Sequence, residues 1–253
     1  MGVEPSRKQD KNYEILYFDE WIKKYGCYEV YPEEEYRRIL RESGILGEKE
    51  KSLLLDIGCG AGAFSARLSE HFRVVGLDIS KEAIRIASGK GGSKFIIADM
   101  EYLPFKNNSF DLVFIGGALH HCPNLIASIA KELGGILKKQ GKVYIFEPHA
   151  LAPGNFYNFH FSTEPTKNEK ALLPWKIKKI FQNNGFSSFQ YKDIGEVTHI
   201  FPENYSGSLK LKRPVALKML GILVLVCINI LLKIPGLNKL FPGTFFVVSC
   251  ARN

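Results

Sequence analysis

A glycine-rich turn near residue 60 constrains the fold more than any other feature of this chain. The apolar run Leu53–Ile57 predicts a buried strand, the segment Gly58–Gly62 a turn, and the residues from Ala63 onward a helix. Glycine allows positive φ and lets a ligand come close to bare backbone. The free N–H groups at a helix start favour a carboxylate or phosphate. The sequence therefore predicts a cofactor site at the carboxyl end of this strand.

Short apolar runs alternate with helical segments along the rest of the chain. Runs that predict strands lie at residues 52–56, 73–78, 94–98, 110–115, 142–147, 188–194 and 244–251. Segments that predict helices lie at residues 62–71, 81–88, 123–137 and 171–184. This alternation indicates βαβ units and a parallel sheet. Because no linker is long enough to divide the 253 residues, we expect a single domain.

The N-terminal part is rich in aromatic residues. Residues 1–12 are polar, and we expect them to be frayed. Aromatic side chains at helical spacing from Tyr13 to Tyr25 predict an amphipathic segment that packs on the domain. Pro32 and the three glutamates after it predict a second helix, which Gly44 can end. We divide the chain into an N-terminal helical cap (1–48), a cofactor-binding core (49–150) and a substrate-side part (151–253).

Two acidic residues indicate which cofactor the turn binds. Asp78 comes twenty residues after Gly58, at the end of the second predicted strand, where a carboxylate can bind both hydroxyls of a ribose. Gly58, Gly60 and Ala63 satisfy the dinucleotide pattern G-x-G-x-x-A, so spacing alone leaves NAD open. Asp56 lies two residues before Gly58, where its charge repels a pyrophosphate and attracts an ammonium group. The sequence therefore favours S-adenosylmethionine over NAD.

Residues 50–150 resemble the class I S-adenosylmethionine-dependent methyltransferases, in particular the branch that acts on small molecules and lipids. The segment Asp56–Gly62 looks like the first motif of that family, and Asp78 looks like its ribose acid. Ala98-Asp99-Met100 looks like the adenine-binding segment, and Leu119-His120-His121 like the segment after the fourth strand. The chain departs from the pattern before the fifth strand, where Gln140-Gly141 replaces the usual Pro-Gly.

The resemblance implies a fold, a cofactor and a set of binding residues. The implied fold is α/β, a Rossmann-like seven-stranded sheet of order 3-2-1-4-5-7-6 with strand 7 antiparallel and helices on both faces. The implied cofactor is S-adenosylmethionine, with S-adenosylhomocysteine as product. We assign Cys59 a packing role in the tight loop rather than redox chemistry. The residues expected to bind the cofactor are Asp56, Gly58, Cys59, Gly60, Ala61, Gly62, Asp78, Ile79, Asp99, Met100 and Gly116.

The methyl acceptor is expected beside the carboxyl ends of the fourth and fifth strands. These ends carry His120, His121, Glu147 and His149, with His160 further on, and we take His121, Glu147 and His149 as the candidate catalytic residues for removing a proton from the acceptor. Each has a structural alternative, as a helix cap or as packing near the cofactor. Histidine and glutamate can also bind a metal, but these residues are not at i, i+4 spacing and the resembled family rarely uses one. We therefore predict no metal.

The net charge of +8 comes entirely from residues 151–253, which hold 13 basic and 5 acidic side chains. This part includes a hydrophobic helical insertion at about 206–242, with twenty mostly apolar residues at 215–234. A single membrane span there would place two strands of one sheet on opposite sides of the bilayer, so we predict none. The basic residues around it favour a membrane-facing segment at 209–242. A buried helix, a lid or a dimer contact stays open.

The sequence predicts a cytoplasmic methyltransferase, peripheral on the inner membrane face if the insertion contacts lipid. Its acceptor is expected to be small and hydrophobic or lipid-like. Nucleic acid is disfavoured, because the segment Gly116–Leu119 replaces the Asn/Asp-Pro-Pro-aromatic run of enzymes that methylate base amines. Two alternatives stay open: an NAD-dependent oxidoreductase, and a catalytically silent protein that binds cofactor or membrane as a partner. The sequence gives no oligomeric state.

Overall fold

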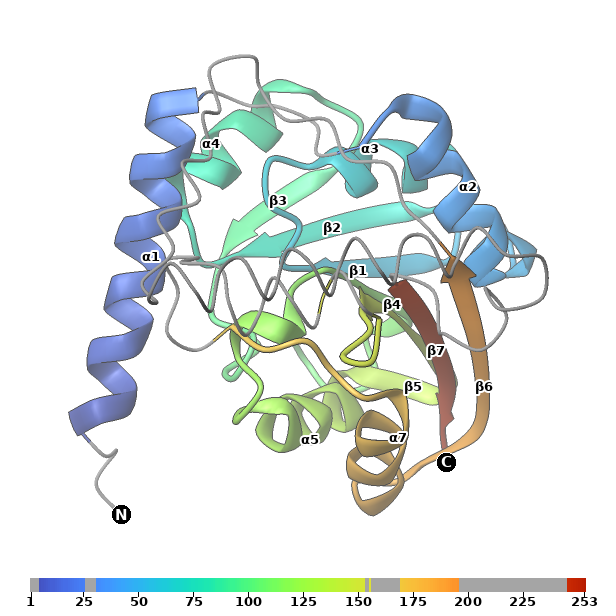
Figure 1. Ribbon diagram of the computed structural model, residues 1–253. Coiled ribbons are helices and arrows are strands. Elements are labelled where there is room, and N and C mark those ends of the chain that lie inside the picture. Colours follow the sequence, from blue (N-terminus) through green and yellow to red (C-terminus); the bar gives the residue numbers. More distant parts are fainter. Residues whose placement is uncertain (1–4, 26–30, 153–154, 156–168, 196–244) are drawn as a thin grey trace, which may run out of the picture.

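A seven-stranded sheet of order β3-β2-β1-β4-β5-β7-β6 forms the centre of the computed structural model (Figure 1). Neighbours from β3 to β5 pair in parallel, whereas β7 pairs antiparallel with both β5 and β6. The predicted strand order and the antiparallel seventh strand are confirmed. The strands are β1 (Leu53–Ile57), β2 (Arg73–Asp78), β3 (Lys94–Ile97), β4 (Phe110–Gly116), β5 (Leu137–Pro148), β6 (Phe186–Gly195) and β7 (Phe245–Arg252). The structure describes residues 5–25, 31–152, 155, 169–195 and 245–253.

Helices cover both faces of the sheet, with α5 and α7 on one face and α2 and α3 on the other (Figure 1). The described α-helices are α1 (Pro5–Tyr25), α2 (Glu33–Ser43), α3 (Ala63–Leu68), α4 (Lys81–Gly89), α5 (Ile126–Ile136) and α7 (Pro174–Asn183). Short 3-10 turns lie at η1 (Ile45–Gly47) and η2 (Leu119–His121). Gly44 ends α2 in the left-handed conformation, as predicted.

Alternate residues of each strand enter two separate hydrophobic clusters. In β1, Leu55 and Ile57 face the cluster under α5 and α7, whereas Leu54 faces the cluster under α2 and α3. The central strands are therefore buried on both faces, which explains why they appear in the sequence as continuous apolar runs. Phe64 of α3 contacts Phe114 of β4 with ring centroids 5.0 Å apart, so the helix that follows the glycine turn is anchored to the sheet. This packing fixes the position of the turn.

Several predicted boundaries were wrong, and three of them affect the site. The N-terminal helix begins at Pro5, so residues 5–12 are helical rather than frayed, and Lys11 is held there by two carboxylates. The helix predicted from Pro123 begins only at Ile126, because residues 123–125 form a turn that the hydrogen bond from the Leu125 N–H to the Cys122 carbonyl closes at 2.9 Å. The fifth strand begins at Leu137, upstream of the predicted turn, and Gln140 with φ 60° lies in a register irregularity of that strand.

The segments expected to line an acceptor pocket and to contact a membrane lie outside the described residues. They include the aromatic residues of 156–161 and the hydrophobic insertion at 206–242. Within the described part of the chain, no helix combines the length and the apolar character needed to cross a bilayer. The division of the chain at residues 48 and 150 stays a prediction.

Candidate active site

The glycine turn after β1 is held in an open loop by the end of β2. Gly58, Gly60 and Gly62 all have positive φ, at 67°, 52° and 80°. The backbone N–H groups of Gly58 and Cys59 donate to the carbonyl of Leu77, at 2.8 and 3.0 Å. A Cβ on Gly60 would meet nothing within 4 Å, so the loop has room for a ligand at this point. A cofactor can therefore lie against bare backbone, as the sequence predicts.

Asp78 closes the other side of this loop. Its Oδ2 accepts the N–H of Gly60 at 2.8 Å, and its Oδ1 accepts the N–H of Ser80 at 2.8 Å. Burial raises the pKa of the Asp78 carboxyl, while these backbone donors act in the opposite direction. A carboxylate has about four lone-pair positions, and the backbone donors of Gly60, Ile79 and Ser80 leave Asp78 room to accept a ribose hydroxyl. Its position fits the predicted ribose acid.

Asp56 is buried beneath the loop, with 1% of its surface exposed. Its Oδ2 accepts the hydroxyl of Ser65 at 2.6 Å. Burial raises the pKa of Asp56 to about 7, and the Ser65 hydrogen bond only partly offsets this. The Ser65 hydrogen bond ties Asp56 to α3, and its attraction of a cofactor ammonium group stays a prediction. A cationic group nearby would favour its ionised form.

Helix α1 crosses the carboxyl ends of β2 and β3 and touches the same site (Figure 1). Lys11 Nζ donates to Asp99 Oδ2 at 2.6 Å and also pairs with Glu101. Asp19 of α1 accepts the hydroxyl of Ser80 at the start of α4. The predicted adenine acid, Asp99, is therefore already bound to a lysine of α1. Sequence reasoning missed Lys11 and Asp19.

Glu147 holds the segment after β4. It is fully buried, and its Oε1 accepts the N–H groups of Ala118 at 2.9 Å and Leu119 at 2.6 Å. Its Oε2 lies 2.8 Å from His120 Nδ1. Burial alone would lower the pKa of His120, but the carboxylates of Glu147 and Glu169 raise it to about 9. Both carboxylate oxygens of Glu147 thus have hydrogen-bond partners within the chain, so this side chain orients the turn and the His120 ring. A catalytic role for Glu147 stays a prediction.

His121 lies beneath α1. Its ring contacts Phe18 edge-on at 5.1 Å between centroids, and its Nδ1 lies 3.9 Å from Glu14 Oε2. Burial, together with the charge of His120, lowers the pKa of His121 to about 3. The ring is therefore neutral at physiological pH. The spacing of Lys11, Glu14 and Phe18 places these residues on one face of a helix, but nothing in the sequence indicated that this face contacts His121.

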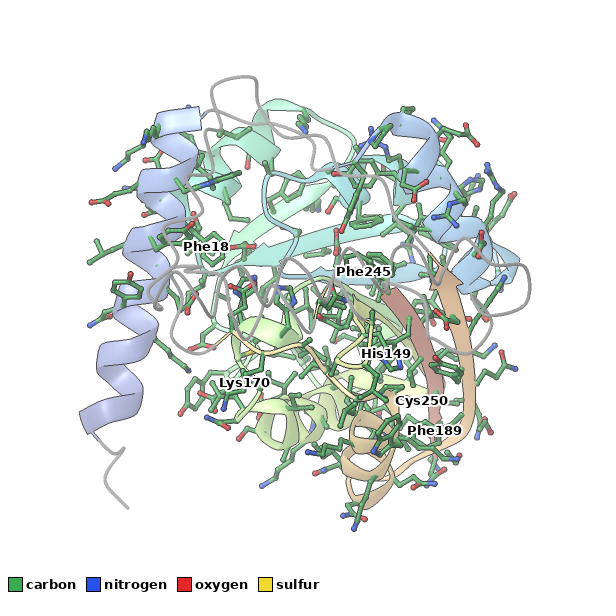
Figure 2. All side chains as sticks on the ribbon, in the orientation of Figure 1. Phe18, His149, Lys170, Phe189, Phe245 and Cys250 are labelled. Atoms are coloured by element: carbon green, nitrogen blue, oxygen red, sulfur yellow. The ribbon has the colours of Figure 1, made fainter. Side chains whose placement is uncertain are left out.

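His149 occupies a separate position after β5. It is 3% exposed, its Nδ1 accepts the N–H of Leu151 at 3.1 Å, and its ring packs on Phe246 at 5.5 Å. Burial lowers the pKa of His149. Figure 2 shows His149 well away from Phe18, the residue that contacts His121. The predicted catalytic residues therefore lie at two places rather than in one cluster.

The remaining predicted cofactor residues gather around the glycine turn or support it. A Cβ on Gly58 would lie 2.4 Å from Ala118 and 3.9 Å from the Met100 methyl group, so the turn packs on both neighbouring segments. Cys59 is 8% exposed, in keeping with a packing role. Gly116 avoids a clash of 2.7 Å with Phe114, which is a structural reason for glycine there. Contact of these residues with a cofactor, and of Ala61 and Ile79, stays a prediction.

The fold and the glycine turn agree with a comparison against known families. Residues 55–145 match the family described as "Methyltransferase domain", from the end of β1 into β5. The matched part of this chain belongs to that methyltransferase family. The predicted family and cofactor are thereby confirmed, and the NAD alternative is not supported.

Relatives of this methyltransferase match only part of their own length. A Methanocaldococcus jannaschii protein, MJ1252, is 39% identical over 170 residues, covering 66% of this chain and 57% of the relative. A demethylmenaquinone methyltransferase of Staphylococcus aureus is 30% identical over 119 residues, covering 44% of this chain and 48% of that enzyme. The chain thus spans about half the length of these curated relatives.

The similarity to a solved structure extends over almost the whole chain. A SAM-dependent methyltransferase from Archaeoglobus fulgidus superimposes with a TM-score of 0.63 and 21% identity, over 93% of this chain and all of that one. At this identity the similarity shows the common fold alone. The acceptor must therefore be argued from the residues of the site.

Proposed function

We propose that this methyltransferase transfers the methyl group of S-adenosylmethionine to a small hydrophobic or lipid-like acceptor. The observation that carries the acceptor class is an apolar surface after β5. Leu151 and Trp175 are 54% and 52% exposed, and both adjoin the buried His149. Large apolar side chains exposed at the carboxyl end of a parallel sheet are suited to an apolar ligand.

The chain supplies binding and orientation on the cofactor side. The backbone of Gly58–Gly62 receives the amino-acid part, Asp78 the ribose, and Asp99 with Met100 the adenine, while Asp56 attracts the ammonium group. When bound, S-adenosylmethionine supplies an activated methyl group on a positively charged sulfur. The protein then has to place the acceptor in line with that methyl group and accept any proton that the acceptor loses.

Glu147 acts in this proposal as a positioning residue. It fixes the turn of Ala118 and Leu119, and this turn packs on Gly58 and carries His120 and His121. His121 and His149 are the residues proposed to face the acceptor. The demethylmenaquinone methyltransferases of S. aureus, by their name, act on a quinone, which supports an apolar acceptor here.

The proposal is tested by titration calorimetry followed by turnover. S-Adenosylhomocysteine is expected to bind and NAD is not; binding of NAD alone would refute the cofactor assignment. Release of S-adenosylhomocysteine from S-adenosylmethionine is then measured with quinols, isoprenoid phenols and small polar acceptors. We expect turnover with the apolar acceptors. No turnover with any of them would favour a catalytically silent binding protein.

Trp175→Ser is expected to raise the KM for an apolar acceptor at least about fivefold, because burial of an aromatic side chain against the ligand is lost. The dissociation constant for S-adenosylhomocysteine should not change. Leu16→Ser is the matched control, since Leu16 is 62% exposed on α1 and is not a neighbour of His149. Equal KM values for the two variants would exclude Trp175 from the acceptor site.

We also propose that the basic, apolar segment 209–242 contacts an anionic membrane surface, where a lipid-like acceptor is concentrated. Sedimentation with vesicles containing phosphatidylglycerol is expected, and replacing Lys210, Lys212 and Arg213 by glutamate should reduce binding at least tenfold, at about 1 kcal/mol for each basic residue. In a control variant, Lys49, Lys51 and Lys94 are replaced by glutamate. The charge change is the same, but it lies in residues 1–150, whose net charge is zero. Equal loss in both variants would show a nonspecific charge effect only.

A further inference from the structure

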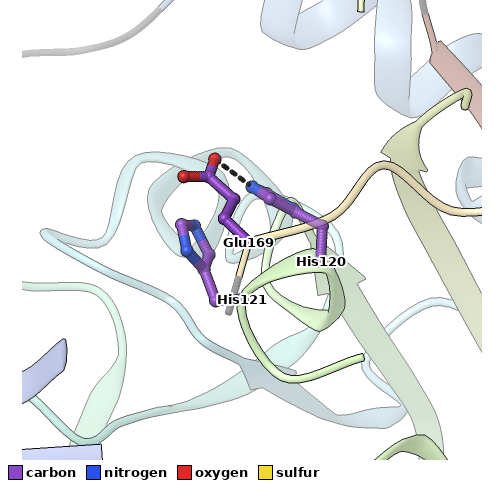
Figure 3. A group of neighbouring side chains, drawn as sticks. All are labelled: His120, His121 and Glu169. Carbon is purple, nitrogen blue, oxygen red and sulfur yellow. Dashed lines mark ion pairs between the residues drawn. The ribbon is translucent and has the colours of Figure 1, made fainter. Parts of the chain in front are cut away.

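Three side chains from two separate segments meet beside the turn after β4. They are His120 and His121 of η2 and Glu169, which precedes the bridge at Leu172 (Figure 3). One donor atom from each lies within 4.8 Å of the other two. The backbone N–H of Lys170 donates to the His120 carbonyl at 2.9 Å, so Glu169 is tied to η2 by the main chain as well.

His120 is oriented as a metal-binding histidine usually is. Its Nδ1 faces the buried carboxylate of Glu147 at 2.8 Å, and its Nε2 points to Glu169 Oε1 at 3.4 Å. Metal-ligating histidines almost always donate their second ring N–H to a carboxylate or carbonyl, which fixes the ring and raises its basicity. Glu147 makes that contact here and holds it with two backbone hydrogen bonds of its own.

The ring of His121 provides an independent observation. Its Nδ1 is buried and has no hydrogen-bond partner among the residues that the structure describes. Its ring lies 4.0 Å from that of His120 between centroids, and the carboxylate of Glu14 is 3.9 Å from its Nδ1. A buried polar atom without a hydrogen bond is costly unless some other group binds there.

The spacing of the donor atoms suits a small cation. With Zn–N and Zn–O bonds of about 2.0–2.1 Å, two ligands of a tetrahedral zinc ion are about 3.3–3.4 Å apart. His120 Nε2 and Glu169 Oε1 are 3.4 Å apart. The third donor, from His121, lies within 4.8 Å of both. Two imidazoles and one carboxylate are a ligand set of zinc and of iron(II).

We propose that His120, His121 and Glu169 bind one divalent transition-metal ion, with Zn²⁺ as the type case, and that Glu147 orients His120 for this purpose. Three protein ligands leave at least one coordination position for an oxygen from outside the chain, as in catalytic zinc sites. This departs from the prediction of no metal, which rested on the absence of i, i+4 spacing and on the resembled family; Glu169, 48 residues after His121, was not among the residues considered there.

The open coordination position could bind the methyl acceptor. This role of the metal site rests on the proposed methyl transfer. An acceptor hydroxyl bound to the ion would have a lowered pKa and would lose its proton near neutral pH. The resulting oxygen anion forms the new bond to the methyl carbon as the sulfur–carbon bond breaks. The sulfur keeps the electron pair of that bond, and the proton passes to water.

The test measures metal binding without any acceptor. The full chain is treated with EDTA, dialysed, incubated with Zn²⁺ and freed of excess metal on a sizing column. We expect one zinc per chain by mass spectrometry, and a visible spectrum of tetrahedral Co²⁺ when cobalt replaces zinc. His121→Ala and Glu169→Gln should each weaken binding at least about tenfold. Glu147→Gln should do so by about 10- to 100-fold, as for other outer-sphere carboxylates.

His71→Ala is the control, because His71 lies beside α3 and away from the cluster, and it should retain one zinc. Unfolding of each metal-free variant is compared with that of the metal-free parent, so a folding defect is recognised. Absence of bound zinc in the parent, or equal retention in the His121, Glu169 and His71 variants, would overturn the proposal. Binding of S-adenosylhomocysteine is measured in the same samples, so failure of the metal site is distinguished from failure of the cofactor assignment.

Discussion

Glu147→Ala is expected to lower the free energy of unfolding by about 3–5 kcal/mol, the usual cost of removing one partner of a buried charged pair. The variant leaves three buried donors without their acceptor: the N–H groups of Ala118 and Leu119 and the ring of His120. Each unsatisfied buried donor is costly because no water reaches it. Urea unfolding monitored by circular dichroism measures the difference.

Two further variants distinguish the loss of the Glu147 hydrogen bonds from the general effect of removing a glutamate. Glu147→Gln keeps an oxygen that can accept from Ala118 and Leu119, so it should lose less stability than Glu147→Ala. Glu50→Ala removes an exposed glutamate and should change stability by no more than about 0.5 kcal/mol. If Glu147→Ala were as stable as Glu50→Ala, the turn after β4 would not depend on Glu147.

Asp56→Asn is expected to weaken binding of S-adenosylhomocysteine about 10- to 100-fold at pH 8, because a hydrogen bond or contact to a charged group is worth about 1.5–3 kcal/mol. 5′-Methylthioadenosine, which lacks the amino-acid part, should bind the variant and the parent equally. Calorimetry with both ligands thus isolates the ammonium group. Equal weakening for both ligands would instead indicate a collapsed loop.

The same substitution is expected to stabilise the protein without cofactor at pH 8. The folded-state pKa of Asp56 is raised from 3.8 to about 7, so the native state keeps a proton that the unfolded state loses. Stability from this group is therefore present below about pH 4 and lost as the pH rises to about 7. Three pKa units correspond to about 4 kcal/mol, which is the upper limit of the gain from asparagine at pH 8.

Urea unfolding at pH 5 and pH 8 checks the sign of the stability change that Asp56→Asn causes. The advantage of Asp56→Asn should be larger at pH 8 than at pH 5. Asp111→Asn provides a control of opposite sign: burial acts to raise the pKa of Asp111, but Lys138 and the N–H of Leu53 lower it overall. That variant should lose stability at pH 8. A gain at pH 8 for both variants would contradict the assignment of Asp56.

The sheet and the cofactor loop were predictable because they depend on short-range patterns. Buried parallel strands are continuous apolar runs, and the glycines of residues 58–62 are needed where the backbone has positive φ. The strand order followed from the resemblance, and the pairing of β7 between β5 and β6 agrees with it. Boundaries at Pro5, Ile126 and Leu137 were missed, because contacts distant in sequence decide them.

The surroundings of the histidines could not be predicted for the same reason. His120 depends on Glu147, 27 residues later in the chain, and on Glu169, and both come close only when β4 and β5 pair. Lys11 reaches Asp99 across 88 residues. The sequence predicted that this aromatic helix packs on the domain, but nothing in its pattern indicated that α1 lies across the carboxyl ends of β2 and β3.

The pairing of Gly195 with Phe245 affects how this methyltransferase can diverge. Residues 196–244 connect these two paired positions in the sequence, so the strands fix only the two ends of this segment. The entropy cost of closing a loop grows only slowly with its length. Evolution can therefore lengthen, shorten or exchange this segment while the glycine turn after β1, which β4 and β5 separate from β7 in the sheet, keeps its geometry. Divergence in acceptor choice is expected to concentrate there.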